Sequence, residues 1–486
     1  MTKSVKVNYI LNLTNTVTQL LFPLITFPYA ARVMQPDGIG QVNFFNSIIS
    51  YIALFVALGI PLYAVREIAM VRDDCKKMNI VTAEIFILNS ILMLGGYVIV
   101  AILCIFVPQI KQDVPLFLIL SLTLLFSTIG CEWFYQGIED FMYITIRGLV
   151  VKIISVVFLF VFVKTKEDIL LYGLYAVLGS IGGNLFNFIH LRKYIKWGDL
   201  PFCELHPFRH LKGSIAIFAF NIVASLYLQL NTVLLGFMKD STAVGFYTSA
   251  TKMMRVVMGI TTSLSSVVMP RMSNYFAEGE RDQFKSLAQK SYDFTIGMTI
   301  PLALGLAFAA PYLIILFCGS MFEASILPSI IISPIIVMVG LSSVLGMQIL
   351  YPMGKIGIVI KTCLIGAITD LTLCFLLIPS YSYNGCAVAY LCAEIATTAS
   401  QYVLGRKYLS LKFFTRNHFH YICAGTILSA FLFFVVHLGI NSRIVNLLLM
   451  LILGGGSYII FLMLIKDSVL ISLIPEKIKT KFSILR

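Results

Sequence analysis

Residues 33–40 read Val-Met-Gln-Pro-Asp-Gly-Ile-Gly, and residues 238–245 read Met-Lys-Asp-Ser-Thr-Ala-Val-Gly. Each stretch is a short polar turn between two long apolar runs. The closing glycines, Gly40 and Gly245, are 205 residues apart, and six apolar runs separate them. Because an even number of membrane spans restores the direction of the chain, this pattern predicts a parallel repeat of two bundles around an axis along the membrane normal.

The composition of the whole chain requires a membrane for these runs. The chain has 486 residues, of which 59% are hydrophobic and 12% charged, and its mean hydropathy is +0.91. A soluble domain carries about twice that share of charged residues. At about 20 residues per span, the apolar residues fill on the order of 14 spans. Soluble enzymes, nucleic-acid-binding proteins and disordered proteins are therefore excluded, and the net charge of +13 is interpreted as loop orientation.

The apolar runs predict an all-α polytopic membrane protein with about 14 transmembrane helices. Their approximate bounds are 7–33, 41–65, 80–107, 114–136, 147–163, 168–193, 213–237, 243–271, 291–317, 324–352, 356–378, 384–405, 419–438 and 444–465. We expect an N-terminal six-helix bundle over 1–205 and a C-terminal six-helix bundle over 206–418. Two additional transmembrane helices and a basic cytoplasmic tail follow over 419–486.

The basic residues test this layout independently. With both termini in the cytoplasm, 27 of the 36 Lys and Arg residues fall on the cytoplasmic side and 6 on the other side, while Lys152, Lys252 and Arg255 lie within spans. Positive residues collect in cytoplasmic loops, so the bias predicts cytoplasmic termini. The longest connection, about 194–212, is basic and mildly amphipathic, and we expect it to lie at the membrane interface.

Polar residues follow one face of the first and the seventh predicted spans. Asn15 and Gln19 belong to the first stripe, and Asn221 and Gln229 to the second. Polar stripes in spans either line a cavity that receives a polar substrate or hydrogen-bond a neighbouring helix. Corresponding stripes in both halves favour a shared substrate-binding cavity, and helix packing is the alternative.

The eighth predicted span carries two cations, Lys252 and Arg255, on one face. They lie ~20–30 Å from the cytoplasmic end of the span, which is too far for their side chains to reach that surface. They must therefore face water, an anionic substrate or carboxylates of neighbouring helices. Substrate binding and a structural ion pair both remain open.

Two acids, Asp370 and Glu394, lie near the middle of the eleventh and twelfth predicted spans, which are adjacent and antiparallel. Two carboxylates at one depth can share a proton or hold a cation, so they are candidates for H⁺ or Na⁺ coupling. They equally suit Lys252 and Arg255 as ion-pair partners. Five further charges lie within two turns of the predicted cytoplasmic face and are expected to snorkel there or to sit at loop edges: Glu84, Glu132, Arg147, Lys152 and Lys361.

Signatures of catalysis are missing from the sequence. It contains no GxxxxGK[ST] phosphate loop, no HExxH or GxSxG motif and no Cys/His cluster. We therefore predict no enzyme activity, no catalytic residues, no metal and no cofactor beyond a coupling ion. The loops predicted on the non-cytoplasmic side are also too short to hold a catalytic domain.

Three stretches carry a family pattern: 27–40 (Phe-Pro-Tyr-Ala-Ala-Arg-Val-Met-Gln-Pro-Asp-Gly-Ile-Gly), 132–139 (Glu-Trp-Phe-Tyr-Gln-Gly-Ile-Glu) and 269–273 (Met-Pro-Arg-Met-Ser). They resemble the Wzx-type bacterial polysaccharide flippases, which translocate O-antigen and capsule repeat units, in the multidrug/oligosaccharidyl-lipid/polysaccharide transporter superfamily. Two departures stand out. Met34-Gln35-Pro36 replaces the usual Leu-Gly-Pro, a change expected to be neutral for the turn. Asn231 stands where an aspartate is expected, which weakens the transfer of an ion site to that position.

The resemblance implies a flippase that moves an undecaprenyl-pyrophosphate-linked oligosaccharide to the outer leaflet of the bacterial cytoplasmic (inner) membrane by alternating access. Lys252 and Arg255 would contact the pyrophosphate or an acidic sugar. The implied partners are this glycan, membrane lipid, and polysaccharide polymerase and chain-length proteins, with no nucleic acid. Two alternatives remain open: a cation-coupled multidrug exporter on the same fold, and a non-transporting scaffold subunit of a polysaccharide synthesis complex.

Overall fold

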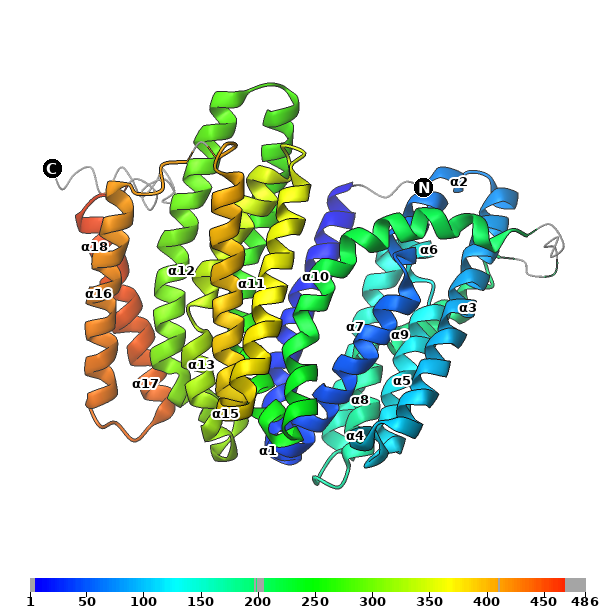
Figure 1. Cartoon of the computed structure of the whole chain (residues 1–486), viewed down its shortest axis with the longest axis horizontal. Helices are drawn as coiled ribbons and strands as arrows, with labels where there is room; N and C mark the ends of the chain where they lie inside the picture. The colour runs from blue at the N-terminus through cyan, green and yellow to red at the C-terminus, as the bar shows by residue number, and fades with distance from the viewer. Residues whose placement is uncertain (1–4, 196–197, 199–204, 410, 468–486) are drawn as a thin grey trace. The chain divides into compact units, whose positions relative to one another are not determined.

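The computed structural model describes residues 5–195, 198, 205–409 and 411–467, without the side chains of 5–21, 216, 219–228, 260, 262–264 and 266. This described part consists of helices and short connections and contains no strand (Figure 1). It confirms the predicted all-α class. By packing, the chain divides into two compact units, Met1–Gly245 and Phe246–Arg486, which we call unit 1 and unit 2.

Unit 1 contains the helices α1 (Val5–Ala57), α2 (Ile60–Val71), α3 (Cys75–Phe106), α4 (Pro108–Lys111), α5 (Val114–Ile129), α6 (Glu132–Gly137), α7 (Phe141–Phe162), α8 (Ile169–Ile181), α9 (Gly183–Leu191), the 3₁₀-helix η3 (Pro207–His210) and α10 (Leu211–Met238). The family stretch at 132–139 forms α6. Its Trp133, Phe134 and Tyr135 are buried among α2, α3 and α9, so this motif serves packing.

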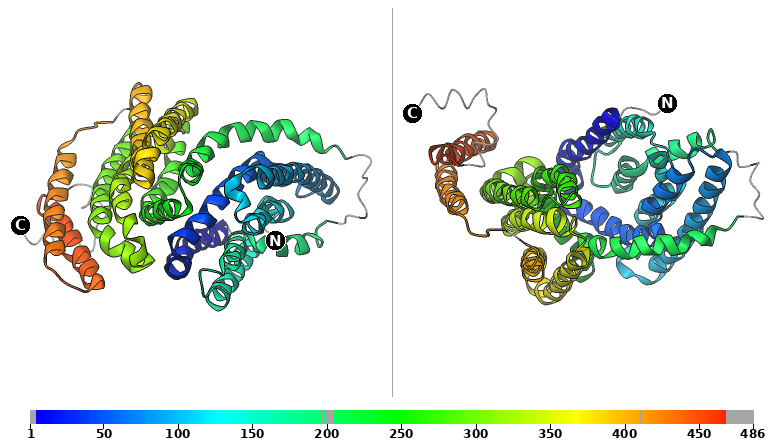
Figure 2. Two further views of the ribbon diagram at one scale, coloured as in Figure 1. Left: turned by 60° about the horizontal axis from the view of Figure 1, so that its bottom comes forward. Right: turned by 90° about the horizontal axis from the view of Figure 1, so that it is seen from above.

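Unit 2 contains most of α11 (Ser241–Ala277), then α12 (Arg281–Cys318), η4 (Ser320–Ser325), α13 (Ile326–Ile332), α14 (Ile335–Ser343), the π-helix η5 (Val344–Leu350), α15 (Ile356–Gly405), α16 (Arg416–His437), α17 (Arg443–Leu449), the π-helix η6 (Met450–Gly455) and α18 (Gly456–Leu464). The C-terminal helices α16 and α18 lie side by side at one edge of this unit, where α16 packs against α12 (Figure 2).

The number of spans depends on two chain reversals. Eight of the described helices are long and apolar enough to cross a membrane, or up to ten if each of two bent pairs is one span. Two of these helices reverse direction, α1 at Gln35 (φ 60°) and α15 at Ser382 (φ 49°), so each has two antiparallel arms (Figure 1). Counting these arms separately, and including α10 and α11, gives the predicted fourteen.

The reversal in α1 changes the interpretation of Gln35. This residue has a left-handed backbone conformation, with φ 60°. Glycine adopts such a conformation without steric cost, whereas a side chain costs about 1 kcal/mol. The left-handed conformation of Gln35 therefore argues against a neutral replacement of the family's glycine.

The two glycines that mark the repeat also contact each other's turns within unit 1. A Cβ added to Gly40 would overlap the backbone oxygen of Ser241, and a Cβ added to Gly245 would overlap the backbone oxygen of Pro36. Small residues allow membrane helices to approach to backbone contact. Both glycines are therefore required by packing between α1 and α11.

Packing places the boundary between the two units after Gly245, whereas the sequence repeat places it after residue 205. Helix α10 packs along α1 and α2, which assigns it to unit 1. The predicted domains 1–205, 206–418 and 419–486 follow the repeat instead, and this division stays a prediction. Residues 468–486 of the predicted basic tail lie outside the described residues.

Candidate functional site

The two predicted cations lie on α11. Lys252 and Arg255 follow the first residue of this helix, Ser241, by 11 and 14 residues. At 1.5 Å per residue they are ~16 and ~21 Å from that end, well inside the span. Lys252 interacts electrostatically with Cys318, at the end of α12, and with Arg255. Because two cations one turn apart repel each other, an anion close to both lowers the electrostatic energy of the site.

The two predicted acids lie at one level on the two arms of α15. Asp370 lies twelve residues before Ser382 and Glu394 twelve residues after it, so both are at the same distance from the reversal. The arms are closely packed at this level, since a Cβ on Gly366 would overlap the Thr397 hydroxyl. Asp370 is fully buried and Glu394 is 6% exposed. The Cys374 thiol donates a weak hydrogen bond to Asp370 Oδ1 at 3.8 Å.

Tyr390 lies close to one of the cations and to both acids. It interacts electrostatically with Glu394, Arg255 and Asp370. We call Lys252, Arg255, Asp370, Tyr390 and Glu394 the charge cluster of unit 2. Sequence reasoning missed Tyr390, although its position four residues before Glu394 places both on one helix face.

The formal charges of this cluster balance, with two cations and two carboxylates. A charge-balanced group is less costly to bury than separate ions. An incoming anion must displace a carboxylate from the cations or meet a carboxylate that a proton or metal cation has neutralised. Ion pairing and anion binding thus both stay open for Lys252 and Arg255.

The polar stripes are described only in part. The side chains of Asn15, Gln19 and Asn221 lie outside the described residues. Gln229 accepts a hydrogen bond at Oε1 from the Ser47 hydroxyl, with a distance of 3.1 Å, which joins α10 to α1. This bond is of the kind that the helix-packing alternative predicts. A role of Gln229 in substrate binding stays a prediction.

A second polar group, which we call the Glu84 cluster, lies where η3 packs on α3. Glu84 and His210 are 1% and 3% exposed. Glu84 Oε2 is 2.9 Å from His210 Nε2 and 2.5 Å from Arg209 Nη2. Its Oε1 accepts a hydrogen bond from the backbone N–H of His206 at 2.8 Å. The other ring nitrogen of His210 is 2.9 Å from the Tyr63 hydroxyl.

Unit 2 contains a similar group, the Asp293 cluster. Asp293 Oδ1, on α12, is 2.8 Å from His418 Nε2 in the first turn of α16. It also accepts a hydrogen bond from Gln289 Nε2 at 2.7 Å. Asp293 follows Glu84 by 209 residues, and His418 follows His210 by 208, close to the 205 residues between the repeat glycines. The common spacing is a signal that sequence reasoning could have used to find both pairs.

Two charges expected to snorkel are buried instead. Glu84 is almost inaccessible, and the side chain of Arg147 is only 10% exposed. Depth along the span predicts that these side chains reach the surface. The connections that cover the helix ends bury them instead. Within the described end of the segment 194–212, His210 is buried against the protein, and the interfacial position of this segment stays a prediction.

Sequence comparison identifies relatives along most of the chain. A family model described as "Polysaccharide biosynthesis protein" matches residues 5–276. The "Putative O-antigen transporter" of Escherichia coli (strain K12) is 23% identical over 380 residues, covering 78% of this chain and 91% of that protein. The protein of the same name from Shigella dysenteriae is 24% identical over 379 residues, covering 77% of this chain and 93% of that protein.

Two solved structures show which fold this is. The lipid II flippase MurJ, in an inward closed conformation, matches with a TM-score of 0.73 and 14% identity, covering 95% of this chain and 100% of that chain. An inward-facing multidrug resistance transporter of the MATE family matches with a TM-score of 0.64 and 14% identity, covering 82% and 98%. At this identity the likeness establishes the fold alone. The family match covers more than half of the chain and confirms the resemblance seen at residues 27–40. This multi-pass membrane protein belongs to the polysaccharide biosynthesis protein family.

Proposed function

We propose that the protein is a flippase that translocates an undecaprenyl-pyrophosphate-linked oligosaccharide repeat unit, of an O-antigen, capsule or exopolysaccharide, from the cytoplasmic to the outer leaflet. The family, the relatives named as O-antigen transporters and the fold shared with a lipid II flippase support this proposal. The observation that carries it is the charge cluster of unit 2, which holds two cations at membrane depth.

The proposed mechanism is an exchange of anions at Lys252 and Arg255. A guanidinium binds two phosphate oxygens at once and an ammonium binds one, so the pair suits a pyrophosphate. Asp370 and Glu394 compete for the same cations until H⁺ or Na⁺ neutralises them. Rocking of the bundles then exposes the site to one membrane face at a time, while Gln229 and the polar stripes contact sugars. Translocation forms and breaks no covalent bond, so the protein acts as a transporter and not as an enzyme.

The proposed location is the bacterial inner membrane with both termini in the cytoplasm. It rests on the 27 of 36 basic residues that fall on one side. Polysaccharide polymerase and chain-length proteins are the proposed protein partners, since they act on the same glycan.

Reconstituted liposomes test the function. They contain a labelled undecaprenyl-pyrophosphate oligosaccharide, and an external membrane-impermeant sugar-modifying reagent reports its exposure. We expect exposure with the wild type and with Arg443→Gln, which removes an exposed cation elsewhere in unit 2. We expect none with Lys252→Gln/Arg255→Gln.

The other outcomes decide against parts of the proposal. Full exposure with the double variant would make both cations structural. Movement of a fluorescent cationic drug in place of the glycan would identify an exporter. If neither moves under an H⁺ or Na⁺ gradient, while cell-surface polysaccharide still depends on the protein, the scaffold alternative is correct.

A further inference from the structure

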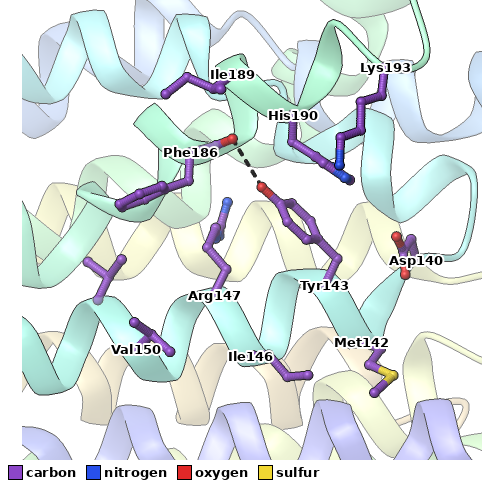
Figure 3. A pocket seen from close by; sticks show the side chains of 11 residues that line it. Asp140, Met142, Tyr143, Ile146, Arg147, Val150, Phe186, Ile189, His190 and Lys193 are labelled. Carbon is purple, nitrogen blue, oxygen red and sulfur yellow. Dashed lines mark hydrogen bonds between the residues drawn. The ribbon is translucent and has the colours of Figure 1, made fainter.

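A pocket outside the proposed transport site lies between α7 and α9 in unit 1 (Figure 3). Its volume is about 610 Å³. The polar side chains that line it are Asp140, Tyr143, Arg147, His190 and Lys193. Figure 3 shows Tyr143 and Arg147 extending from α7 toward α9, which carries Phe186, Ile189 and His190.

Arg147 is the least satisfied group in this pocket. Its side chain is only 10% exposed, and among the described residues its Nε and Nη1 have no hydrogen-bond partner. Its Nη2 is 3.8 Å from Glu132 Oε2, which is too far for a hydrogen bond. Burying a guanidinium with so few acceptors is costly, so an anion placed beside its positive charge would be stabilised here.

The walls of the pocket hold Arg147 in place. The Tyr143 and His190 rings stack with centroids 4.2 Å apart, and the Tyr143 hydroxyl donates to the Phe186 backbone oxygen at 3.0 Å, which ties α7 to α9. Behind the guanidinium stands Gly183, where a Cβ would lie 2.9 Å from Arg147 Nε. The absence of a side chain at Gly183 makes room for the arginine.

The rim of the pocket is apolar and exposed. The exposed side chains Ile146, Val150, Phe186 and Ile189 are each more than 40% accessible. In a membrane-spanning bundle such a rim suits lipid chains, while a cation beside it suits a lipid phosphate. The pocket lies next to the basic segment 192–212, which the charge bias assigns to the cytoplasmic side.

The charges around the pocket match a singly charged head group. The cations are Arg147, Lys193 and Lys152, and the acids are Asp140 and Glu132, which interacts electrostatically with Lys152. Their sum is one positive charge. A phosphodiester carries one negative charge, whereas a pyrophosphate diester carries two, so the balance favours a phospholipid of the bilayer over a pyrophosphate-linked lipid.

We propose that this pocket binds an anionic phospholipid of the cytoplasmic leaflet. The Arg147 guanidinium binds the phosphate, Lys193 lies at the open edge, and the acyl chains cover the apolar rim. The site differs from the charge cluster of unit 2 in ligand and in position along the chain. Its existence does not depend on the transport activity.

The test measures lipid retention by the full-length protein. The protein is taken from nanodiscs of phosphatidylcholine with phosphatidylglycerol, washed with detergent and examined by native mass spectrometry. We expect the wild type to retain one phosphatidylglycerol and Arg147→Gln to bind it roughly tenfold more weakly or worse, since charge-assisted hydrogen bonds are lost. Arg443→Gln, the matched control for loss of one positive charge, retains it.

Gly183→Ala provides a second variant that keeps the arginine and crowds its guanidinium, so the test does not depend on the folding of Arg147→Gln. We expect it to weaken retention as well. Equal retention by the wild type and both variants would overturn the proposal, and so would equal retention of phosphatidylcholine. If undecaprenyl pyrophosphate displaces phosphatidylglycerol from the wild type at a concentration far below that of phosphatidylglycerol, the occupant is the transported lipid and the phospholipid assignment is wrong.

Discussion

The two units use the same position of the repeat for different chemistry. Ser47 and Lys252 are 205 residues apart, the spacing of the repeat glycines. In unit 1, Ser47 donates a neutral hydrogen bond to Gln229. In unit 2, Lys252 lies beside Arg255 and belongs to a cluster with two carboxylates. Away from these positions the units agree, because each has a buried acid–histidine pair that fastens the start of a later helix.

This difference indicates which residues of the repeat stabilise the fold and which act on the substrate. A neutral hydrogen bond is inexpensive to bury, whereas charges at membrane depth cost several kcal/mol unless they are paired or have a ligand. The acid–histidine pairs occur in both units, so we infer that they stabilise the fold. The charge cluster occurs in one unit, so we infer that it serves the substrate.

The largest expected effect concerns the acid–histidine pairs. Removing the carboxylate of a buried hydrogen-bonded group leaves its donors unsatisfied, at a cost of about 1–3 kcal/mol for each donor. Glu84→Leu leaves three donors, on His210, Arg209 and His206, without their acceptor, whereas Asp293→Leu affects two, on His418 and Gln289. We expect thermal unfolding in detergent to show a larger loss for Glu84→Leu.

The conservative variants Glu84→Gln and Asp293→Asn are the controls, because they keep an acceptor oxygen at each site. Equal stability of all four variants and the wild type would show that these pairs do not fasten the helices.

The next effect concerns transport and separates the repeat positions. Arg255→Gln removes charge-assisted hydrogen bonds, each worth about 1.5–3 kcal/mol, so we expect the initial rate of glycan exposure to fall roughly tenfold to a hundredfold. Ser47→Ala removes a neutral bond and costs about 1 kcal/mol of stability, and we expect its transport rate to stay within about twofold of the wild type.

Arg255→Lys, which keeps the charge, should recover part of the rate. A rate for Ser47→Ala as low as that for Arg255→Gln would show that the neutral position also contacts substrate, and the asymmetry between the units would be lost.

The sequence was sufficient for the class of the fold, and the reason is physical. Apolar runs of spanning length have no alternative to a membrane helix, so composition and run length predicted the spans. Residue type and depth also selected Lys252, Arg255, Asp370 and Glu394. The proximity of Arg255, Asp370 and Glu394 to Tyr390 depends on how α11 and α15 pack, which no local pattern in either helix reveals.

The burial of Glu84 and Arg147 was not predicted, because the residues that cover them are distant in the sequence. Glu84 and His210 are 126 residues apart, and Gly183, which makes room for Arg147, is 36 residues from it. By depth along the span alone, Glu84 and Arg147 lie close enough to the membrane surface to snorkel. The strain at Gln35 was missed for a different reason, since the identity of a residue does not disclose its φ angle.

A smaller effect distinguishes the two turns that mark the repeat. Gln35 adopts a left-handed conformation, whereas Asp240, 205 residues later, caps α11 by accepting a hydrogen bond from Ala243 N at 2.7 Å. Gln35→Gly should raise stability by about 1 kcal/mol, because it relieves backbone strain. Asp240→Gly should lower stability, because it removes the cap. Unfolding midpoints measure both, and a loss of stability in Gln35→Gly would refute the strain argument.

The smallest expected effect compares the starts of α3 and α12. Asp74, the N-cap of α3, accepts hydrogen bonds from the backbone N–H groups of Lys77 and Lys76, and these bonds lower the pKa of its carboxyl below the usual range. Glu280 stands 206 residues later, at the N-cap of α12, and makes no side-chain cap bond. Asp74→Ala should therefore reduce stability slightly, and Glu280→Ala should leave it unchanged.

The effect of Asp74 also has a defined dependence on pH. Because its pKa is lower in the folded protein, its contribution is complete above the unfolded value of about 4 and is lost as the pH falls through the folded value. The difference in unfolding midpoint between the wild type and Asp74→Ala should thus be constant from pH 8 to about 6 and shrink below about 4. A difference that persists unchanged in acid would show that the carboxylate charge takes no part in the cap. A loss in Glu280→Ala equal to that in Asp74→Ala would show that the two helix starts are equivalent, although only one of them has a side-chain cap.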